Sequence, residues 1–208
     1  MSERDCVLLV FSRAPDPGAV KTRLLPVLGE KKTTELYKTL LNKTLQTCRR
    51  AGFAAIQLWC YPDTGHPYFS TCSRQFNAEL REQRGSDLGE RMWYALAEAL
   101  KQYQHGIIIG CDCPDLNVGD LTTAAAKLNA GYDVVLGPSV DGGYYLVGGN
   151  TADRDIFRDI TWGTAEVLSV TRDRIRELKL SCYLLPEHRD IDRPEDLGYG
   201  KWEIGNRE

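Results

Sequence analysis

Basic side chains gather in the loop that follows the first apolar run of the chain. Residues 5–11 read DCVLLVF, and the next thirteen, SRAPDPGAVKTRL, carry Arg13, Lys21 and Arg23. Guanidinium and ammonium groups neutralise phosphate oxygens, and a guanidinium can do so with two parallel hydrogen bonds. The loop therefore predicts contact with a phosphorylated ligand.

This loop contains GAVKT but lacks the pattern of a P-loop. A P-loop needs a glycine directly before its lysine, whereas two residues separate Gly18 from Lys21. Pro15 and Pro17 have no N–H, so backbone donors that a phosphate requires are missing. Pro26 argues against a helix that starts at Lys21. We therefore expect a long loop that presents its cations beside a strand end, and we count Gly18 among the ligand-binding candidates.

Carboxylates follow three later apolar runs. Asp112 and Asp115 come at the end of IIIGC, Asp141 comes after DVVLGP, and Asp190 and Asp192 come after SCYLLP. The carboxyl ends of strands in an α/β sheet form one rim, so these side chains are expected to meet. Carboxylate oxygens suit Mg²⁺ or Mn²⁺, and nearby cations suit the phosphates that such a metal accompanies. The pattern predicts a metal-supported site for a nucleoside diphosphate or triphosphate.

Each of these acidic residues also has a purely structural explanation. Asp115 could cap the following helix, Asp141 could close the turn VDGG, and Asp190 or Asp192 could cap the segment RPEDLG. His188 lies beside the last pair and could serve the site or simply be exposed in a loop. The joint occurrence of these groups at strand ends is what favours a functional site.

Short apolar runs alternate with amphipathic ones along the whole chain. The two other histidines, His66 and His105, fall in expected loops, and Ser86 or Asp87 is the expected N-cap of the second helix. Alternation of this kind predicts an α/β fold with a mostly parallel sheet covered by helices on both faces, in a single domain over residues 1–208. We expect strands at 5–11, 54–60, 78–83, 107–111, 133–138, 144–149 and 181–186, and helices at 30–51, 87–103, 118–130 and 164–179.

Composition limits the classes of partner. The 208 residues carry a formal net charge of −3, so no general basic surface indicates nucleic acid or an anionic membrane. The seven cysteines are scattered without a CxxC pair, which favours reduced thiols and a cytoplasmic location. No run approaches the ~18 apolar residues of a membrane span.

Three motifs give the chain a resemblance to a known family. KTRLLP (21–26) is similar to the G-x-G-T-R-M-x-P signature of nucleotidyltransferases, without its first glycines, and GCDCPDL (110–116) is similar to their strand-end G-D-x-P element. QRGSDLGERM (83–92) stands where they have Q-x-x-x-L-G. With VLGPSVDGGYYLVG and DIDRPEDL, nearly the whole chain resembles the bacterial transferase family associated with radical-SAM and selenodomain proteins. That family belongs to the nucleotide-diphospho-sugar transferase superfamily, and the resemblance implies a GT-A-type (Rossmann-like) fold and glycosyltransferase activity.

The resemblance implies roles for the residues that match these motifs. Asp112 takes the place of the metal-binding aspartate, with Asp190 or Asp192 as the second ligand of Mg²⁺ or Mn²⁺. The cations of the first loop would neutralise charge as a phosphate oxygen departs. The 83–92 segment implies contacts to base and ribose, and its candidate residues are Gln83, Gly89 and Arg91.

A second group of candidates is expected on the sugar or acceptor side. The glycine pair of VDGG lets a ligand approach the backbone closely. Tyr144 and Tyr145 could instead pack one on each face of a strand, and Trp162 could cover the pocket or fill the core. The candidates on this side are Asp141, Gly142, Gly143 and Tyr145, with Trp162 as a candidate cover of the pocket. Asp115 is a further substrate-binding candidate that is assigned to neither side.

Two classes of function follow. One is a transferase that uses an activated nucleotide, as a glycosyltransferase acting on a nucleotide sugar or as a nucleotidyltransferase acting on a nucleoside triphosphate. The other is a nucleotide-binding module without catalysis. Because Lys21, Arg23, Asp112 and Asp192 occur together, we favour the enzyme, and because the phosphate-binding glycines are missing we favour the nucleotide-sugar donor. The base, the sugar, the acceptor and the oligomeric state are left open.

Overall fold

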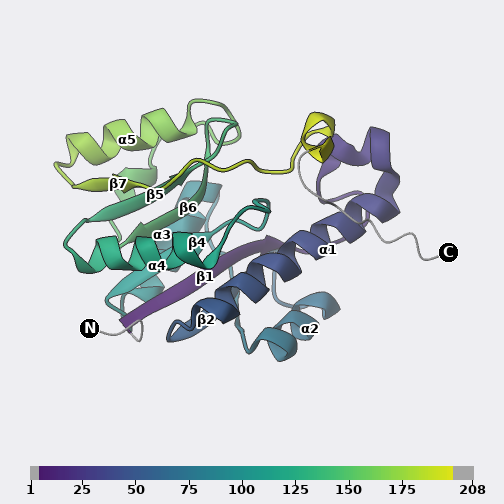
Figure 1. Ribbon diagram of the computed structural model, residues 1–208, viewed down its shortest axis with the longest axis horizontal. Coiled ribbons are helices and arrows are strands. Elements are labelled where there is room, and N and C mark those ends of the chain that lie inside the picture. The colour runs from purple at the N-terminus through teal and green to yellow at the C-terminus, as the bar shows by residue number, and fades with distance from the viewer. Residues whose placement is uncertain (1–4, 199–208) are drawn as a thin grey trace.

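The computed structural model describes residues 5–198, which form one layered α/β domain (Figure 1). Its seven-stranded sheet has the order β3-β2-β1-β4-β6-β5-β7. All neighbouring strands are parallel except β6, which runs antiparallel to both β4 and β5. The strands are β1 Cys6–Arg13, β2 Ala55–Tyr61, β3 Glu79–Glu82, β4 His105–Ile109, β5 Val134–Pro138, β6 Tyr144–Gly149 and β7 Cys182–Leu184.

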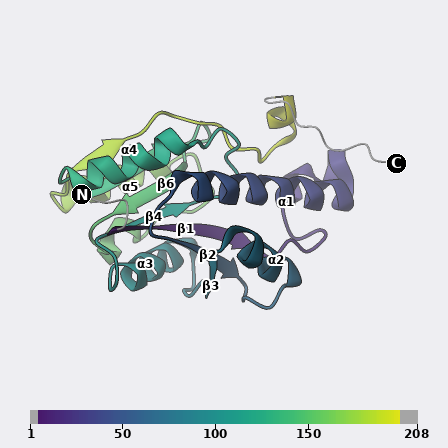
Figure 2. The same cartoon turned by 60° about the horizontal axis from the view of Figure 1, so that its bottom comes forward.

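Helices cover both faces of the sheet, as predicted. Figure 2 shows α1 and α4 on one side of the strands and α3 on the other. The core residues divide in the same way, because those of α1, α2 and α4 pack in one cluster and those of α3 and α5 in a second. The helices are α1 Leu25–Ala51, α2 Pro67–Phe76, α3 Leu88–Ala99, α4 Val118–Asn129 and α5 Val167–Glu177, with short 3-10 turns η2 Thr22–Leu24, η3 Arg154–Phe157 and η4 Pro194–Gly198.

The first strand shows why these runs form a buried sheet. Successive side chains of a strand point to opposite faces, so a strand covered on both sides needs a continuous apolar run. Leu8 and Val10 belong to the cluster beneath α1, whereas Val7, Leu9 and Phe11 belong to the cluster beneath α3. The strand thus delivers its last residues, at its carboxyl end, to a fixed place.

Helix α1 begins earlier than expected. The prediction placed its start at residue 30, but the helix spans Leu25–Ala51 with Pro26 in its first turn. A proline is tolerated there because the first helical N–H groups have no intrahelical acceptor. Gly29 has φ 71° and interrupts the helical backbone, so the regular part does start near residue 30. The helix ends at Gly52, as the sequence indicated, in a left-handed conformation.

Two further expectations about local structure were wrong. Residues 67–76, left without an assigned element, form α2, whose buried Phe69, Cys72 and Phe76 repeat at helical spacing. His105, expected in a loop, is the buried first residue of β4 and lies 3.0 Å from Asn129 Oδ1 through its Nε2. Tyr144 and Tyr145 do face opposite sides of the sheet, since each packs in a different core cluster.

The segment after β7 returns across the sheet to the N-terminal end of α1. Figure 1 shows η4 beside the start of α1. A small cluster holds this contact: Leu24, Leu36 and Leu40 pack with Ile191, and Leu197 joins them. This packing brings Asp190 and Asp192 close to the loop that carries Lys21 and Arg23. No helix in residues 5–198 is long and apolar enough to cross a membrane.

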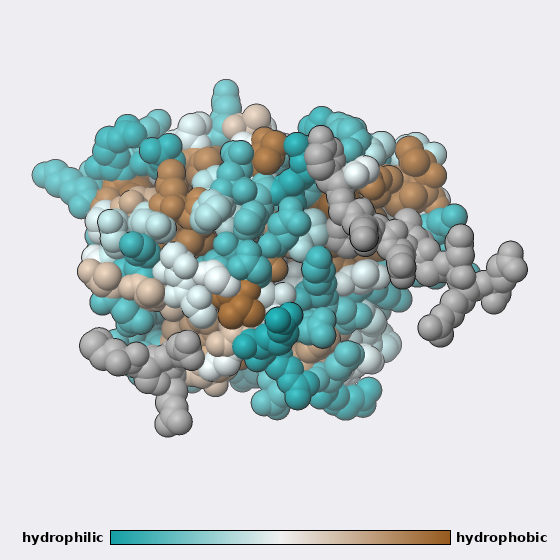
Figure 3. All heavy atoms as spheres, in the orientation of Figure 1, coloured by the Kyte–Doolittle hydropathy of each residue, from teal (hydrophilic) through white to brown (hydrophobic). Residues whose placement is uncertain are grey.

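The hydropathy of the surface is mixed in the view of Figure 3, where hydrophilic residues separate smaller hydrophobic areas. Single exposed apolar residues such as Val27 and Val140 are normal on a folded domain. No single exposed area of this view therefore indicates a functional site.

Candidate functional site

A cleft of about 520 Å³ opens at the carboxyl ends of β1, β2 and β4. Arg13 ends β1, Tyr61 ends β2, and Asp112 follows β4 by three residues. Ligands of open α/β sheets bind at this edge, outside the carboxyl ends of the strands. Nine of the sequence candidates line this cleft, hereafter the outer cleft: Arg13, Lys21, Arg23, Gln83, Arg91, Asp112, Tyr145, Asp190 and Asp192.

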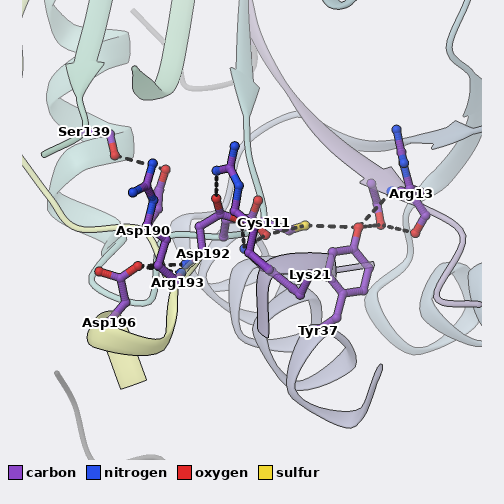
Figure 4. A network of polar contacts seen from close by, with 12 residues as sticks. Arg13, Lys21, Tyr37, Cys111, Ser139, Asp190, Asp192, Arg193 and Asp196 are labelled. Atoms are coloured by element: carbon purple, nitrogen blue, oxygen red, sulfur yellow. Dashed lines mark hydrogen bonds and ion pairs between the residues drawn. The ribbon is translucent and has the colours of Figure 1, made fainter. Parts of the chain in front are cut away.

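Lys21 lies at the centre of a charge network (Figure 4). Its Nζ is 2.7 Å from Asp112 Oδ1 and 3.9 Å from Asp192 Oδ1, and its side chain is only 3% exposed. Burial is the largest single influence and opposes the charged ammonium. The charge and hydrogen bond of Asp112, together with Cys111 and Asp192, outweigh burial and raise the pKa of Lys21 above its usual value. Its backbone is left-handed, with φ 48°, a conformation that costs about 1 kcal/mol or more for a residue with a side chain.

The second cation of the loop is more open to solvent. Arg23 Nη1 donates a hydrogen bond to Asp192 Oδ2, and the two side chains are 53% and 34% exposed. An exposed ion pair of this kind contributes little to stability. Arg23 and Asp192 can therefore give up this ion pair and bind a ligand instead, at a small cost in free energy.

Arg13 and Arg91 lie at the other end of the outer cleft, beside Tyr61. Their guanidinium carbons are 5.1 Å and 4.0 Å from the centre of the Tyr61 ring. Neither forms an ion pair within residues 5–198, although Arg91 Nε donates to Gly85 O. This end of the outer cleft thus holds positive charge that no carboxylate neutralises. The amide of Gln83 is used structurally, because its Nε2 donates to Ser12 O and Trp59 O.

Tyr37 of α1, which the sequence did not single out, fixes the back wall of the cleft. Its hydroxyl oxygen accepts from Arg13 N at 2.8 Å and lies 3.0 Å from Ser12 Oγ. Cys111 Sγ donates to the same hydroxyl. Burial raises the pKa of both Tyr37 and the Cys111 thiol, so neither is ionised at neutral pH. A buried tyrosine at helical spacing looks like a core residue, and only the fold shows that it positions the strand end.

Asp190 differs from the two ion-paired carboxylates. Ser139 Oγ donates to its Oδ2 at 3.0 Å, and its Oδ1 has no hydrogen-bond partner within the described residues. Burial, with the nearby charges of Asp112 and Asp141, raises its pKa from 3.8 to about 7. It lines both the outer cleft and a second hollow behind it.

This second hollow, hereafter the inner pocket, has a volume of about 200 Å³. It shares six lining residues with the outer cleft: Phe11, Leu88, Gly110, Tyr144, Tyr145 and Asp190. Trp162 packs edge-on against Tyr144 at its wall, with ring centres 6.4 Å apart. Of the candidates expected on the acceptor side, it collects Asp141, Gly143, Tyr145 and Trp162.

Four sequence candidates line neither cavity. Asp115 is exposed, Gly18 forms a turn with φ 78°, and Gly142 packs against Ala165. Gly89 instead allows close packing, since a Cβ there would lie 2.7 Å from Phe157 O and 2.8 Å from Trp162 Cζ2. Their proposed contacts with a ligand stay predictions.

The structural explanations offered for the acidic residues apply to one of them. Asp141 closes its turn, because its Oδ1 accepts from Gly143 N. Helix α4 is capped by Asn117 rather than Asp115, and Asp196 rather than Asp190 or Asp192 accepts the backbone N–H groups at η4.

His188 is part of the framework rather than of the cleft. Its Nε2 is 2.9 Å from Asp120 Oδ2, and its ring stacks at 4.8 Å on Tyr145. It lines neither cavity. Its role is therefore to hold Tyr145 and α4 together, not the exposed-loop role that the sequence also allowed.

The three predicted metal ligands, Asp112, Asp190 and Asp192, differ in how they are placed. Within residues 5–198 no group of three or more His, Cys, Asp or Glu side chains is arranged to hold a metal ion. Asp112 and Asp192 do converge on one cation, the Lys21 ammonium, so their carboxylates are close enough to the same charge to hold a cation together. A divalent ion bound with a nucleotide needs only one or two carboxylates, since phosphates and water supply the remaining ligands. These two residues therefore fit a shared metal–nucleotide site, whereas the paired Oδ2 of Asp190 faces Ser139.

Comparison with known proteins identifies the class of the molecule. Residues 44–164 match the family model described as uncharacterized proteins conserved in bacteria, DUF2064. The match covers more than half of the chain, and the chain belongs to this family. No curated protein matches it.

Solved structures show the fold. The chain is similar, at 29% identity and with a TM-score of 0.83, to a protein of Desulfovibrio desulfuricans G20 described as a candidate nucleotide-diphospho-sugar transferase, covering 98% of this chain and 92% of that one. Glucosyl-3-phosphoglycerate synthase of Mycobacterium tuberculosis, solved with Mn²⁺ and UDP, has a TM-score of 0.58 at 10% identity over 94% and 75% of the chains. CMP-2-keto-3-deoxy-manno-octonic acid synthetase with CTP has a TM-score of 0.53 at 13% identity over 93% and 95%. The fold is that of the nucleotide-diphospho-sugar transferases, as predicted.

Proposed function

We propose that this protein is a glycosyltransferase that transfers a sugar from a nucleotide-sugar donor to an acceptor hydroxyl with the help of Mg²⁺ or Mn²⁺. The observation that carries the proposal is the outer cleft, in which four cationic side chains and the converging carboxylates Asp112 and Asp192 lie at the carboxyl ends of the parallel strands. The phosphates of a diphosphate would contact the cationic side chains, and its metal ion would contact the carboxylates.

The chain's own residues would act on the diphosphate of the donor. Arg13 and Arg91, which form no ion pair with any carboxylate of residues 5–198, would bind phosphate oxygens beside Tyr61. Lys21 and Arg23 would exchange their carboxylate partners for phosphate oxygens and so stabilise the departing nucleoside diphosphate. Asp112 and Asp192 would hold the metal, which when bound offsets negative charge on the same leaving group.

In this reaction the acceptor oxygen forms a bond to the anomeric carbon of the sugar while the bond from that carbon to the phosphate oxygen breaks. The hydroxyl proton is released, and the nucleoside diphosphate leaves with the electron pair of the broken bond. The inner pocket adjoins the outer cleft and is the place where an acceptor would meet the donor. No protein nucleophile is needed.

The finer predictions from the sequence belong to the same proposal. The order of the three motifs supports membership of the branch associated with radical-SAM and selenodomain proteins. The cytoplasmic location is supported by the cysteines, all seven of which are free thiols.

A thermal-shift screen tests the proposal. Nucleoside mono-, di- and triphosphates of each base are crossed with Mg²⁺, Mn²⁺ and EDTA, because a bound ligand stabilises the fold by RT ln(1 + [L]/Kd). We expect the largest rise in Tm with a nucleoside diphosphate or a nucleotide sugar plus metal. Equal Tm values for all nucleotides and for the buffer would refute a nucleotide-using enzyme.

A further inference from the structure

The inner pocket differs from the outer cleft in charge. The outer cleft is lined by Arg13, Lys21, Arg23 and Arg91. The inner pocket, although it opens into that cleft, is lined by no Lys, Arg or His among the described residues. Its two charged residues are the acidic Asp141 and Asp190. A phosphate or carboxylate placed there would lose its hydration without gaining a cationic partner, so the pocket disfavours an anionic occupant.

The walls of the inner pocket are mainly apolar and aromatic. Side chains from β1, α3, β4, β6, α5 and the loop before α5 supply this surface. A cavity of about 150 Å³ with similar walls is large enough for benzene. At about 200 Å³ the inner pocket has room for one ring and a substituent. The apolar and aromatic lining residues are Phe11, Leu88, Met92, Ile108, Tyr144, Tyr145, Leu146, Val147, Trp162 and Val167.

Few polar atoms of the wall are left for a ligand. Thr164 Oγ1 donates to Thr161 O, and Tyr145 Oη donates to Pro186 O. Three buried side-chain atoms of lining residues have no hydrogen-bond partner within residues 5–198: Asp190 Oδ1, Trp162 Nε1 and Tyr144 Oη. A free hexose carries several hydroxyl groups, and each one that is buried without a partner costs about 1–3 kcal/mol. One carboxylate acceptor, one indole donor and one tyrosine hydroxyl suit a molecule with one or two hydroxyl groups better than a hexose.

We propose, resting on the glycosyltransferase function above, that the acceptor bound in the inner pocket is an uncharged alcohol with an apolar, single-ring body. Because the cations line the outer cleft and not the inner pocket, we expect phosphate groups on the donor and none on the acceptor. Sugar phosphates and phosphorylated or carboxylated acids are then excluded as acceptors, because no Lys, Arg or His among the described residues lines the inner pocket.

The test uses ligand-detected saturation-transfer NMR on the full chain without nucleotide. The probes are benzyl alcohol, benzyl phosphate and glucose at equal concentration. We expect clear saturation of benzyl alcohol and at least fivefold less of the other two. Stronger saturation of benzyl phosphate or of glucose, or no binding of any probe, would overturn the proposal.

Variants locate the binding. Thr164→Trp fills the inner pocket from its exposed rim and is expected to reduce the benzyl alcohol signal at least fivefold. Trp162→Phe keeps an aromatic wall but removes the unpartnered N–H, with an expected two- to fivefold loss. Trp93→Phe, whose indole bonds to Ala152 O away from both cavities, is the matched control and should change nothing. Circular dichroism checks folding, and an unchanged signal in both pocket variants would contradict the assignment.

Failure here is distinguishable from failure of the proposed function. UDP binding is measured by calorimetry on the same samples, because it depends on the outer cleft. UDP binding without benzyl alcohol binding refutes only the acceptor class, whereas absence of UDP and other nucleotide binding refutes the enzyme assignment itself.

Discussion

The outer cleft and the inner pocket share six residues and differ in almost every physical property. The outer cleft carries four cations, two of which are already paired with carboxylates. The inner pocket has apolar walls and three buried polar atoms without a hydrogen-bond partner among the described residues. Two adjoining cavities with such different chemistry indicate a site that separates a phosphate-bearing ligand from an uncharged one. The difference also yields variants that should affect one ligand and not the other.

The largest expected effect comes from Lys21. Lys21→Ala removes the buried cation of the outer cleft and should weaken UDP binding about 10- to 100-fold, since a hydrogen bond to a charged group contributes about 1.5–3 kcal/mol. Uridine, which has no phosphate, should bind as before. Calorimetry of the variant compares the two ligands, with Lys32→Ala on the exposed side of α1 as control. A parallel loss for uridine would assign Lys21 to the framework of the fold.

Asp112→Asn is expected to act only when metal is present. The variant keeps the shape of the side chain but loses a carboxylate that the metal would need, so UDP binding with Mn²⁺ should weaken by about 1–3 kcal/mol. In EDTA the affinity should stay equal or rise, because Lys21 no longer has its 2.7 Å partner. Asp115→Asn, an exposed carboxylate outside both cavities, is the matched control. Equal effects with and without metal would exclude Asp112 as a metal ligand.

Asp190 should make stability depend on pH. Its pKa is raised in the folded chain, so folding takes up a proton between about pH 4 and pH 7, and the free energy of unfolding falls as pH rises through this window. Asp190→Asn should therefore be more stable than the parent at pH 8 and equal to it near pH 4. The rise from 3.8 to about 7 sets an upper bound of about 4 kcal/mol, and we expect about 1–2 kcal/mol. Urea titrations at the two pH values measure it, and a difference that is the same at both would contradict the burial of this carboxyl group.

The smallest effect is expected at Gly89. Gly89→Ala places a Cβ within 2.8 Å of Trp162 and must shift the wall of the inner pocket. The substitution should lower the free energy of unfolding by about 1 kcal/mol and weaken the binding of benzyl alcohol more than the binding of UDP. Gly198→Ala, whose Cβ would have no neighbour within 4 Å among the described residues, is the control. If the variant weakened UDP binding more than benzyl alcohol binding, Gly89 would belong to the nucleotide site, as the sequence motif implies.

The outer cleft could be predicted from the sequence because its chemistry is carried by charged residues. Arg13 and Asp112 directly follow apolar runs, and the carboxyl ends of parallel strands meet at one edge. The return of residues 186–198 to α1 could not be predicted in detail, since it depends on the packing of Ile191 against Leu24 and Leu36. The ion pair between Lys21 and Asp112, 91 residues apart, therefore became visible only in the structure.

The inner pocket was harder to predict, because apolar side chains that line a pocket look like core residues in a sequence. Met92, Ile108 and Val147 have the spacing of a buried helix face and of buried strands. The sequence allowed Trp162 either to cover the pocket or to fill the core, and in the structure its side chain lines the pocket. For Gly142 and Gly89 the structure adds a packing reason that the sequence did not show, since they lie close against Ala165 and Trp162.

The central claim is that the outer cleft binds a nucleoside diphosphate leaving group, and calorimetric titration tests it most directly. Matched series of nucleoside diphosphates and triphosphates are titrated into the protein with Mn²⁺. We predict that diphosphates bind at least as tightly as triphosphates, because Pro15 and Pro17 leave the loop without the backbone donors that a third phosphate would need. A clear preference for a triphosphate, with pyrophosphate released on mixing with a sugar phosphate, would contradict the account and assign the protein to the nucleotidyltransferases.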